Sequence, residues 1–435
     1  MSPARPALAV LAGWTALAVA ASFWPEPLLP VWIGAGALLA AAALVDAAIL
    51  RAQQPCEIER DVAPALALGT SNRIVLTLRN PGRLALRLRL HDHAPASFAV
   101  SGMPCALAIE ADGSQRVEYR AQPCERGPVQ FEAADLSIAS PLRLWKRRAR
   151  MGPAQSVRVY PNFQRVQEYA RLALDRRTVQ MGIHQRPRRG EGLEFHQLRE
   201  YRSGDPLRQI DWKATARLGK AISREYQEER DQQIVLLLDC GRRMHTRDGE
   251  LAHFDHALDA VLLLAHVALR HGDGVGVLSA GAQERWVAPR KGLAQHRLLM
   301  NAVYDLRTTD HATDYLALAT ALAARIRKRA LVILVTNVRD EDQQELAQAM
   351  QLLGRRHLVL AASLRERALG ETLEQPVESE QDAVLSAATH LYLESRRAAH
   401  AQLRAIGLHL IDAEPSQLAV ALVNGYLDIK RRALL

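Results

Sequence analysis

The chain has 435 residues, of which 49% are hydrophobic and 24% are charged. This length predicts two or three domains and excludes a single small one, and the composition is that of a globular protein. The formal net charge of +9 is modest and is spread over many arginines. It fits either an ordinary soluble surface or a protein that lies close to an anionic surface.

Two apolar runs stand at the start of the chain. Ala7 to Trp24 carries no charge, and Leu28 to Leu50 carries only Asp46. A membrane-spanning helix needs about 20 mostly apolar residues, so both runs qualify. Pro25-Glu26-Pro27 separates them with a tight connection. Residues 1–52 are therefore predicted to form a transmembrane helical hairpin.

The basic residues around this hairpin predict its orientation. Arg5 precedes the hairpin and Arg51 follows it, while the short loop has no basic residue. The positive-inside rule then places both outer ends in the cytoplasm, which predicts a multi-pass protein of the inner membrane with cytoplasmic soluble domains. A cleaved signal peptide ending near Ala20-Ala21-Ser22 is the alternative, and the second run would still stop transfer. The four cysteines lack metal-type spacing and are expected to be reduced.

Residues 53–162 show short alternating segments. The runs 74–78 and 84–90 alternate apolar and other residues around Asn80-Pro81-Gly82, which predicts one hairpin with a buried face. Further strands are expected at 117–119, 129–131 and 157–160. Strands at this spacing predict an antiparallel, immunoglobulin-like β-sandwich that acts as an adhesive or spacer module.

Two basic tracts occur at 145–150 and 186–190. Next to a membrane such tracts can contact anionic lipid headgroups, and solvated strand ends and loops are the simpler interpretation. No aromatic interleaving or recognition motif accompanies either tract, so nucleic acid is not an expected partner.

Residues 233–435 alternate strands and helices, and the segment 330–336 is a fully apolar strand of the kind buried under helices on both faces. This alternation predicts an α/β domain with a doubly wound, mostly parallel sheet. Ligands of such sheets bind at the carboxyl ends of the strands. Asp239 and Thr336-Asn337 occupy those ends.

The segment 163–232 holds the densest polar cluster of the chain. Gly204 and Pro206 bracket Asp205, which predicts a turn. Arginine and aspartate pair bidentately, and an arginine plane can stack on Trp212 or Tyr201. We expect a structural ion-pair network that joins the two domains. The members of this signature motif are Arg199, Arg202, Gly204, Asp205, Arg208, Asp211, Trp212 and Arg217.

This motif, followed by the strand Ile-Val-Leu-Leu-Leu-Asp that ends at Asp239, resembles the domain-of-unknown-function family fifty-eight. The resemblance extends in order of elements from about Arg51 to the C-terminus. It implies a membrane-tethered protein with a von Willebrand A-like domain. Such proteins are typically encoded beside MoxR-type AAA ATPases, so the resemblance implies that ATPase or its client as partner.

The resemblance also implies where a divalent metal would bind. Asp239 fills the first position of the usual Asp-x-Ser-x-Ser motif, but Gly241 and Arg243 replace the two serines. Thr313 matches the loop threonine, and Asn337, with Asp340 nearby, stands at the last aspartate. Too few oxygen ligands remain, so we expect no metal or other cofactor. The expected partner-binding edge consists of Asp239, Gly241, Arg242, Arg243, Thr313 and Asn337, of which Asp239 and Thr313 are the weak metal candidates.

Other chemistry is sparse. His253 and His256 have helical spacing without a further zinc ligand, and Cys240 has no histidine placed to activate it. The glycines at 272–276 precede a strand, which is the wrong order for a dinucleotide site. We therefore expect a non-enzymatic adaptor. A hydrolase built on the Arg/Asp cluster around Gly204–Trp212 is the alternative; an open cleft there would favour it, and a buried, fully paired network would favour the adaptor.

Overall fold

The computed structural model describes residues 1–162, 194–202, 207, 210–227, 232–249, 251–281, 284–432 and 434, with the backbone alone at 27, 194–197 and 225–227. These residues form two compact units, Met1–Val159 and Tyr160–Leu435. The sequence of segment 164–180 is compatible with a helix, but this segment and the basic tract 186–190 lie outside the described residues.

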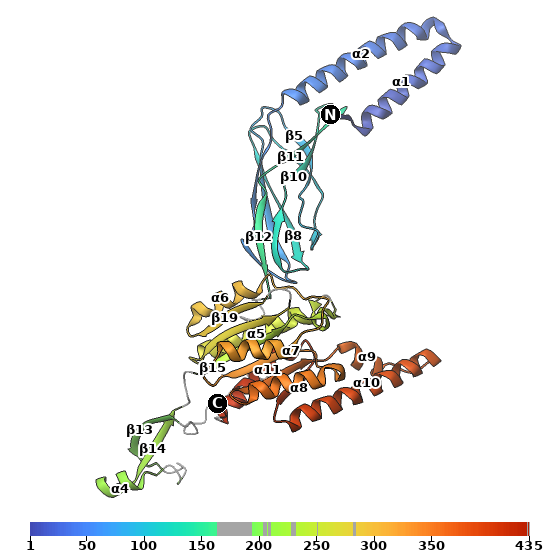
Figure 1. Cartoon of the computed structure of the whole chain (residues 1–435). Coiled ribbons are helices and arrows are strands. Elements are labelled where there is room, and N and C mark those ends of the chain that lie inside the picture. Colours follow the sequence, from blue (N-terminus) through green and yellow to red (C-terminus); the bar gives the residue numbers. More distant parts are fainter. Residues whose placement is uncertain are drawn as a thin grey trace. The chain divides into compact units, whose positions relative to one another are not determined.

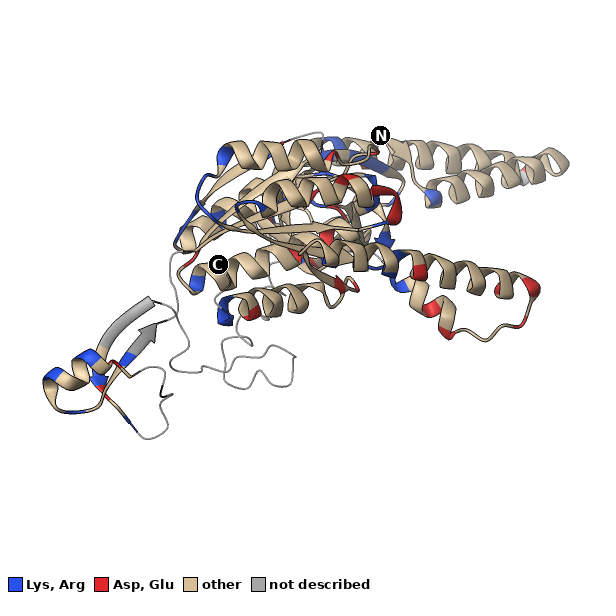
Figure 2. Cartoon of the chain, turned by 60° about the horizontal axis from the view of Figure 1, so that its bottom comes forward, with Lys and Arg blue, Asp and Glu red and all other residues tan. Residues whose placement is uncertain are grey.

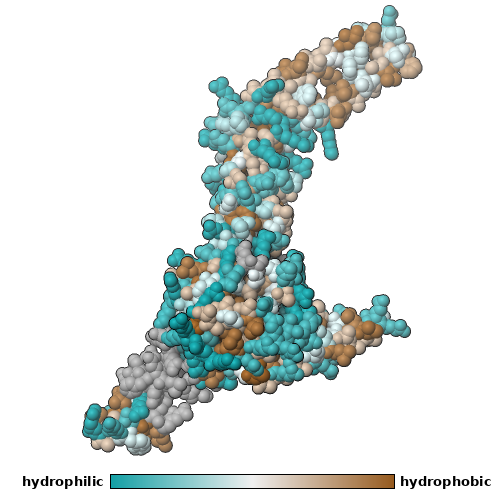
Figure 3. Space-filling model, in the orientation of Figure 1, coloured by the Kyte–Doolittle hydropathy of each residue, from teal (hydrophilic) through white to brown (hydrophobic). Residues whose placement is uncertain are grey.

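The first unit begins with the expected pair of long apolar helices, α1 (Arg5–Phe23) and α2 (Pro25–Ala52) (Figure 1). Both are long and apolar enough to cross a membrane, by length and composition. Figure 2 shows almost no charged residues along them, and Figure 3 shows apolar residues on their surface. Trp14 stacks on Trp32 with 5.0 Å between ring centroids. Gly36 permits this approach, because a Cβ there would lie 2.9 Å from the Trp14 ring.

The rest of the first unit is an all-antiparallel β-domain in the pairings described. Its three sheets have the orders β1-β11-β10-β5-β7, β2-β4-β8-β6 and β3-β12-β9. The strands are β1 (Ser2–Pro3), β2 (Glu57–Asp61), β3 (Ala65–Ala67), β4 (Asn72–Arg79), β5 (Leu86–His91), β6 (Phe98–Ser101), β7 (Cys105–Ile109), β8 (Ser114–Pro123), β9 (Gly127–Phe131), β10 (Ala134–Ala139), β11 (Trp145–Met151) and β12 (Gln155–Tyr160).

The predicted hairpin between the runs 74–78 and 84–90 is wrong. Both runs are strands with one buried face, but β4 pairs with β2 and β8 while β5 pairs with β10 and β7. The chain crosses between sheets at Asn80, whose amide donates to the carbonyls of Leu84 and Glu110, both at 2.9 Å. Alternation specifies which face of a strand is buried and leaves its partner open.

A buried ion pair joins the three sheets of the β-domain. Arg60 on β2 donates to both carboxylate oxygens of Asp92, at 3.0 and 2.5 Å, and to the Glu132 carbonyl at 2.6 Å. Tyr119 on β8 donates to the same carboxylate at 2.6 Å. Burial, together with this bond to Asp92, raises the pKa of the Tyr119 hydroxyl. The carboxylate is thereby fully hydrogen bonded, as a buried charge must be.

A second buried carboxylate attaches the helical hairpin to the β-domain. Asp46 on α2 is fully buried. It accepts from the Ser140 hydroxyl at 2.5 Å and from the backbone N–H groups of Leu142 and Leu144 at 3.0 and 3.3 Å. These donors belong to the turn between β10 and β11. The single charge of the second apolar run thus holds the hairpin to the β-domain, and we call this set of hydrogen bonds the Asp46 latch. Sequence reasoning did not anticipate it.

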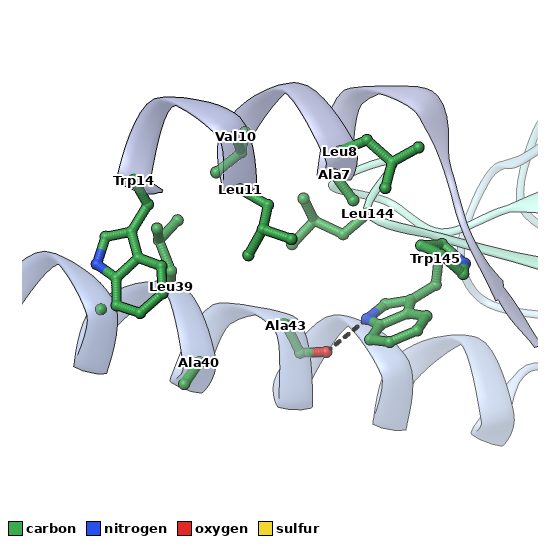
Figure 4. Close-up of a pocket in the computed structure, with 12 residues that line it drawn as sticks. Ala7, Leu8, Val10, Leu11, Trp14, Leu39, Ala40, Ala43, Leu144 and Trp145 are labelled. Atoms are coloured by element: carbon green, nitrogen blue, oxygen red, sulfur yellow. Dashed lines mark hydrogen bonds between the residues drawn. The ribbon is translucent and has the colours of Figure 1, made fainter. Parts of the chain in front are cut away.

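Further bonds reinforce this attachment. The Trp145 indole donates to the Ala43 carbonyl at 2.9 Å (Figure 4). Arg147 donates to the carbonyls of Leu50 and Gln53 at the end of α2, where a cation also complements the helix dipole. At the other end of the hairpin, β1 pairs with the start of β11. Between α1, α2 and this turn lies an apolar cavity of about 380 Å³.

The second unit contains the predicted alternation of strands and helices around a six-stranded sheet of order β19-β18-β15-β20-β21-β22. Only β19 is antiparallel. The elements are β15 (Gln233–Asp239), α5 (His253–Arg270), β18 (Gly274–Ala280), β19 (Arg285–Arg290), α6 (Leu293–Val303), α7 (Tyr315–Arg325), β20 (Leu331–Thr336), α8 (Gln343–Gly354), β21 (Leu358–Leu364), α9 (Arg367–Glu374), α10 (Glu380–Ala405), β22 (His409–Ala413) and α11 (Leu418–Arg431).

Each face of this sheet has its own core. Ile234, Leu236 and Leu238 of β15 pack with α5, α6 and α11 on one face. Val235 and Leu237 pack with α7 and α8 on the other. The apolar strands are therefore buried on both sides, and the carboxyl ends of β15 and β20 meet at one edge of the sheet.

We predict that Asp46→Ala loosens the attachment of the hairpin to the β-domain. The Ser140 hydroxyl and two amides would lose their acceptor, at about 1–3 kcal/mol for each group left unsatisfied. Asp46→Asn keeps one acceptor oxygen and serves as the graded control. In hydrogen–deuterium exchange on the detergent-solubilised full chain, residues 140–145 should exchange fastest in Asp46→Ala, while β4 stays unchanged. Equal protection in wild type and Asp46→Ala would contradict the latch.

Candidate functional site

The carboxyl edge of the α/β sheet is built around Asp239, the last residue of β15, which is 2% exposed. One carboxylate oxygen accepts from the Gly241 amide at 2.7 Å and from the Thr313 hydroxyl. The other accepts from Tyr315 at 3.0 Å and from Thr336 at 2.5 Å. Burial and the neighbouring Asp239 charge raise the pKa of Tyr315 well above its ordinary value, so this donor keeps its proton. Four protein donors therefore surround the carboxylate. We call the Asp239 carboxylate and these four donors the Asp239 cage.

Gly241 is in close contact with this cage. A Cβ at Gly241 would overlap the Thr313 hydroxyl and lie 3.1 Å from the Asp239 carboxylate. A serine cannot occupy this position unless Thr313 moves. The lone pairs that a divalent cation would use are already engaged by protein donors. The residues present therefore fit a hydrogen-bonded carboxylate and do not fit a metal site.

The two arginines that follow Gly241 have different surroundings. Both begin the short 3-10 helix η3 (Arg242–His245). The Arg243 side chain is 9% exposed and pairs with Glu341 at 2.7 Å and with Asp342, so its charge is matched there and not by Asp239. Arg242 is exposed, and the structure gives its side chain no ion pair among the described residues. Its amide donates to the His311 carbonyl at 2.9 Å, which fixes the backbone beneath it.

Asn337 is fully buried and belongs to another group of residues. Its amide nitrogen donates to Glu366 at 2.8 Å, and its oxygen accepts from Arg396 at 3.0 Å. Burial by itself would raise the pKa of Glu366, but the bond from Asn337 and the charges of Arg339 and Arg396 lower it overall. The fold thus turns Asn337 toward a buried polar cluster and away from the Asp239 cage. Asp340 accepts from Ser395 at 2.8 Å. It therefore does not take the place expected for Asn337 beside Asp239.

Arg396 on α10 organises this buried cluster and was missed by sequence reasoning. It is 3% exposed and donates to Ser363 at 2.7 Å and to Asp412 at 2.9 Å, besides the bond to Asn337. It therefore ties α10 to the ends of β20, β21 and β22. Burial and the Arg396 charge lower the pKa of the nearby His400 to about 4. The helical spacing of Arg396 with Ala399 and Leu403, both buried, was the available signal.

An open depression of about 370 Å³ lies next to the Asp239 cage. The end of β18, the loop 309–314 and the first turns of α7 form it. Ser279, Glu284, His311 and Asp314 contribute polar groups to its lining. The edge therefore combines a rigid, hydrogen-bonded floor with a hollow that has polar walls.

The signature motif falls partly within the described residues. Its described residues lie on or beside a small element made of β13 (Glu194–Glu200), α4 (Trp212–Leu218) and β14 (Ile222–Gln227), in which β13 and β14 pair antiparallel. Asp211 caps α4 by accepting from the Ala214 amide at 3.0 Å and pairs with Arg224 at 2.9 Å. The hydrogen bond from the Ala214 amide is the main cause that lowers the pKa of Asp211, and the hydrogen bond from Arg224 is the second. Gly204, Asp205 and Arg208 lie outside the described residues.

The other motif residues lie along the same small element. Arg199 is on β13, where it donates to the Glu200 carbonyl at 3.1 Å, and Arg202 follows that strand with an exposed side chain. Trp212 is 70% exposed at the start of α4, and Arg217 lies in its last turn. The described contacts of Asp211 are thus local to this element.

The remaining residues considered for metal binding or catalysis lie in surroundings that indicate a structural role. Across the ranges described, no three or more His, Cys, Asp or Glu side chains come together as a metal site. His253 is fully buried at the start of α5, and burial lowers its pKa. Cys240 is buried beside the cage. Within the glycine-rich stretch 272–276, Asp273 accepts from Tyr426 at 2.6 Å and from Lys430 at 2.8 Å, which ties α11 to the sheet.

The family model described as "Protein of unknown function DUF58" matches residues 197–391, from β13 into α10. Residues 197–391 therefore carry the sequence features of this family. "Uncharacterized protein YeaD" of Bacillus subtilis is 23% identical over 262 residues, which is 59% of this chain and 62% of that protein. The match thus spans less than two thirds of the relative.

Solved structures give weaker matches. The CARDB domain of a Pyrococcus furiosus protein, solved with di-metal ions, is 7% identical and covers 25% of this chain and 90% of that chain, with a TM-score of 0.19. Salmonella alpha-2-macroglobulin is 16% identical over 24% of this chain and 7% of its own, with a TM-score of 0.20. Scores this low establish no shared fold.

We predict that Gly241→Ser destabilises the α/β unit by about 1–3 kcal/mol, the usual cost of overpacking a buried position. Adding Thr313→Ala should recover most of this loss, because it removes the overlapping hydroxyl while the new serine can donate to Asp239. Thermal unfolding of the full chain, followed by circular dichroism, measures both effects. If Gly241→Ser alone melts like wild type, the close packing of Gly241 against Thr313 is refuted.

Proposed function

We propose that this chain is a membrane-anchored, non-enzymatic interaction protein whose carboxyl sheet edge binds a protein partner. The observation that carries the proposal is the contrast at this edge between Asp239, which four protein donors surround, and Arg242, which is exposed on a fixed backbone. An edge of this kind offers a rigid polar platform without reactive groups. Arginine is enriched at protein interfaces because its planar fork pairs with carboxylates and stacks on flat groups.

The family resemblance supports the identity of the partner. A MoxR-type AAA ATPase or its client protein fits, and the adaptor would then act in protein maturation or envelope-related processes. The single antiparallel strand β19 at the edge of an otherwise parallel sheet supports a von Willebrand A-like domain. The antiparallel sheets of the first unit similarly support an immunoglobulin-like sandwich as a spacer.

The same geometry supports an edge without metal or other cofactor. A cation at Asp239 would have to displace hydrogen bonds from Thr313, Tyr315 and Thr336 and find ligands where Gly241 has none. The hydrolase alternative gains no support from the described part of the motif. Asp211 is engaged as a helix cap and as the ion partner of Arg224.

We further propose that the hairpin spans the inner membrane with the soluble domains in the cytoplasm. Arg5 and Arg51 flank the hairpin, and β1 pairs with β11, which brings both ends of the hairpin to the β-domain. A reporter that is active only outside the cytoplasm should stay silent after Leu435 and respond when inserted near Glu26. The opposite pattern would refute this topology.

We predict that Arg242→Ala weakens binding of the partner ATPase by about thirtyfold while the chain melts normally. Loss of an arginine anchor from a desolvated interface often costs about 2 kcal/mol or more. Arg243→Ala should instead lower the melting temperature, because it leaves Glu341 and the partly buried Asp342 without their cation. Co-purification of the full chain with the neighbouring MoxR-type ATPase measures the first effect.

Arg270→Ala is the matched control, because Arg270 is also exposed but ends α5, at the opposite edge of the sheet. It should leave both co-purification and melting unchanged. If the ATPase never co-purifies, or if Arg242→Ala binds it like wild type, the edge is not the docking surface.

A further inference from the structure

The outer face of the β-domain carries a compact group of cations that the linear sequence only partly reveals. Arg87 and Arg89 on β5 and Lys146 and Arg148 on β11 alternate with inward-facing residues. The register aligns them in two rows, Arg87–Ala139–Lys146 and Arg89–Ser137–Arg148. None of these four cations forms an ion pair with a described residue. We call them the basic face.

Small side chains form the floor between these cations. Ser137 and Ala139 lie on the central strand β10, and Ala106 and Ala108 lie opposite Arg89 and Arg87 on β7. Two shallow hollows of about 480 and 530 Å³ result. Arg87, Arg89 and Lys146 line the first, and Arg89 and Arg148 line the second, which Asp135 and Arg150 also line. Strands two positions apart in a sheet are about 10 Å apart. Arg89 and Arg148 can therefore converge on one phosphate group above Ser137, whose hydroxyl is a further donor.

The basic face begins beside the membrane hairpin. Ala139 and Lys146 directly flank the turn whose residues Ser140, Leu142 and Leu144 bind Asp46 on α2. Arg143, at the tip of this turn, is exposed and lines the nearer hollow. The second row lies two residues farther along the strands, or about 7 Å. Basic side chains at this position next to a membrane helix are attracted to anionic lipids.

We propose that the basic face binds the headgroups of anionic phospholipids in the bilayer that holds the hairpin. A phosphodiester supplies the oxygens that arginine forks accept, and the small-residue floor leaves room for it. Apart from His91, the face lacks the aromatic side chains on which nucleic-acid bases stack. The inference rests on the proposed membrane anchoring. It adds that the β-domain itself is held against the lipid surface and is not a freely moving spacer.

The test uses the full chain in detergent micelles, titrated with short-chain phosphatidylglycerol or phosphatidylcholine and followed by native mass spectrometry. Wild type should bind phosphatidylglycerol roughly tenfold more tightly than phosphatidylcholine, or better. The double variant Arg89→Gln/Arg148→Gln should lose roughly thirtyfold of that affinity, about fivefold for each cation next to an anionic surface. The control Arg116→Gln/Arg120→Gln removes two exposed arginines of β8, on another sheet, and should bind like wild type.

Three results would overturn the proposal. They are equal binding of the two lipids, equal loss in the two double variants, and tighter binding of poly-glutamate or single-stranded DNA through Arg89 and Arg148. The last result would identify a soluble polyanion as the ligand. Alkaline extraction of membranes separates this inference from the anchoring beneath it. A chain that resists extraction but lacks the lipid preference refutes only the basic face, whereas a chain that is extracted refutes the anchor.

Discussion

A carboxylate removed from water must have its charge matched by hydrogen bonds or a cation, and this constraint organises both units of the protein. Asp46 binds the turn that joins the helical hairpin to the β-domain, and the Arg60–Asp92 pair joins three sheets. In the second unit, Asp239 closes the carboxyl edge of the sheet and Asp273 fixes the last helix. Each carboxylate joins segments that are distant in the chain, so each helps to fix how those segments pack together.

The hydrogen bonds that satisfy the Asp239 charge determine which groups remain available at this edge of the sheet. One hydroxyl from the loop 309–314, one from the end of β20, one tyrosine and one amide satisfy the charge without a metal. These bonds fix the edge, and the groups left exposed lie around the cage. Arg242 is the clearest of these, because Arg243 is already held by Glu341 and Asp342. Adjacent arginines in the sequence thus have different surroundings, one exposed and one held in ion pairs.

The first unit shows how the two apolar helices and the β-domain are joined. The Asp46 latch, the Trp145 bond to α2 and the Arg147 cap all involve the turn and first residues of β11. The same strand presents Lys146 and Arg148 outward with the arginines of β5. One strand therefore binds the hairpin through some residues and presents cations outward through others, because its side chains alternate between faces.

Local patterns in the sequence predict what depends on local physics. The two apolar helices, the one-sided burial of β4 and β5, the doubly buried strands and the place of Asp239 at a strand end all follow from length, polarity and period. Contacts between distant segments were decided only by the tertiary structure. Period-two alternation cannot say that β4 and β5 lie in different sheets, and the identity of Asn337 cannot say that it binds Arg396. The latch at Asp46 depends on donors about a hundred residues away, which no local pattern encodes.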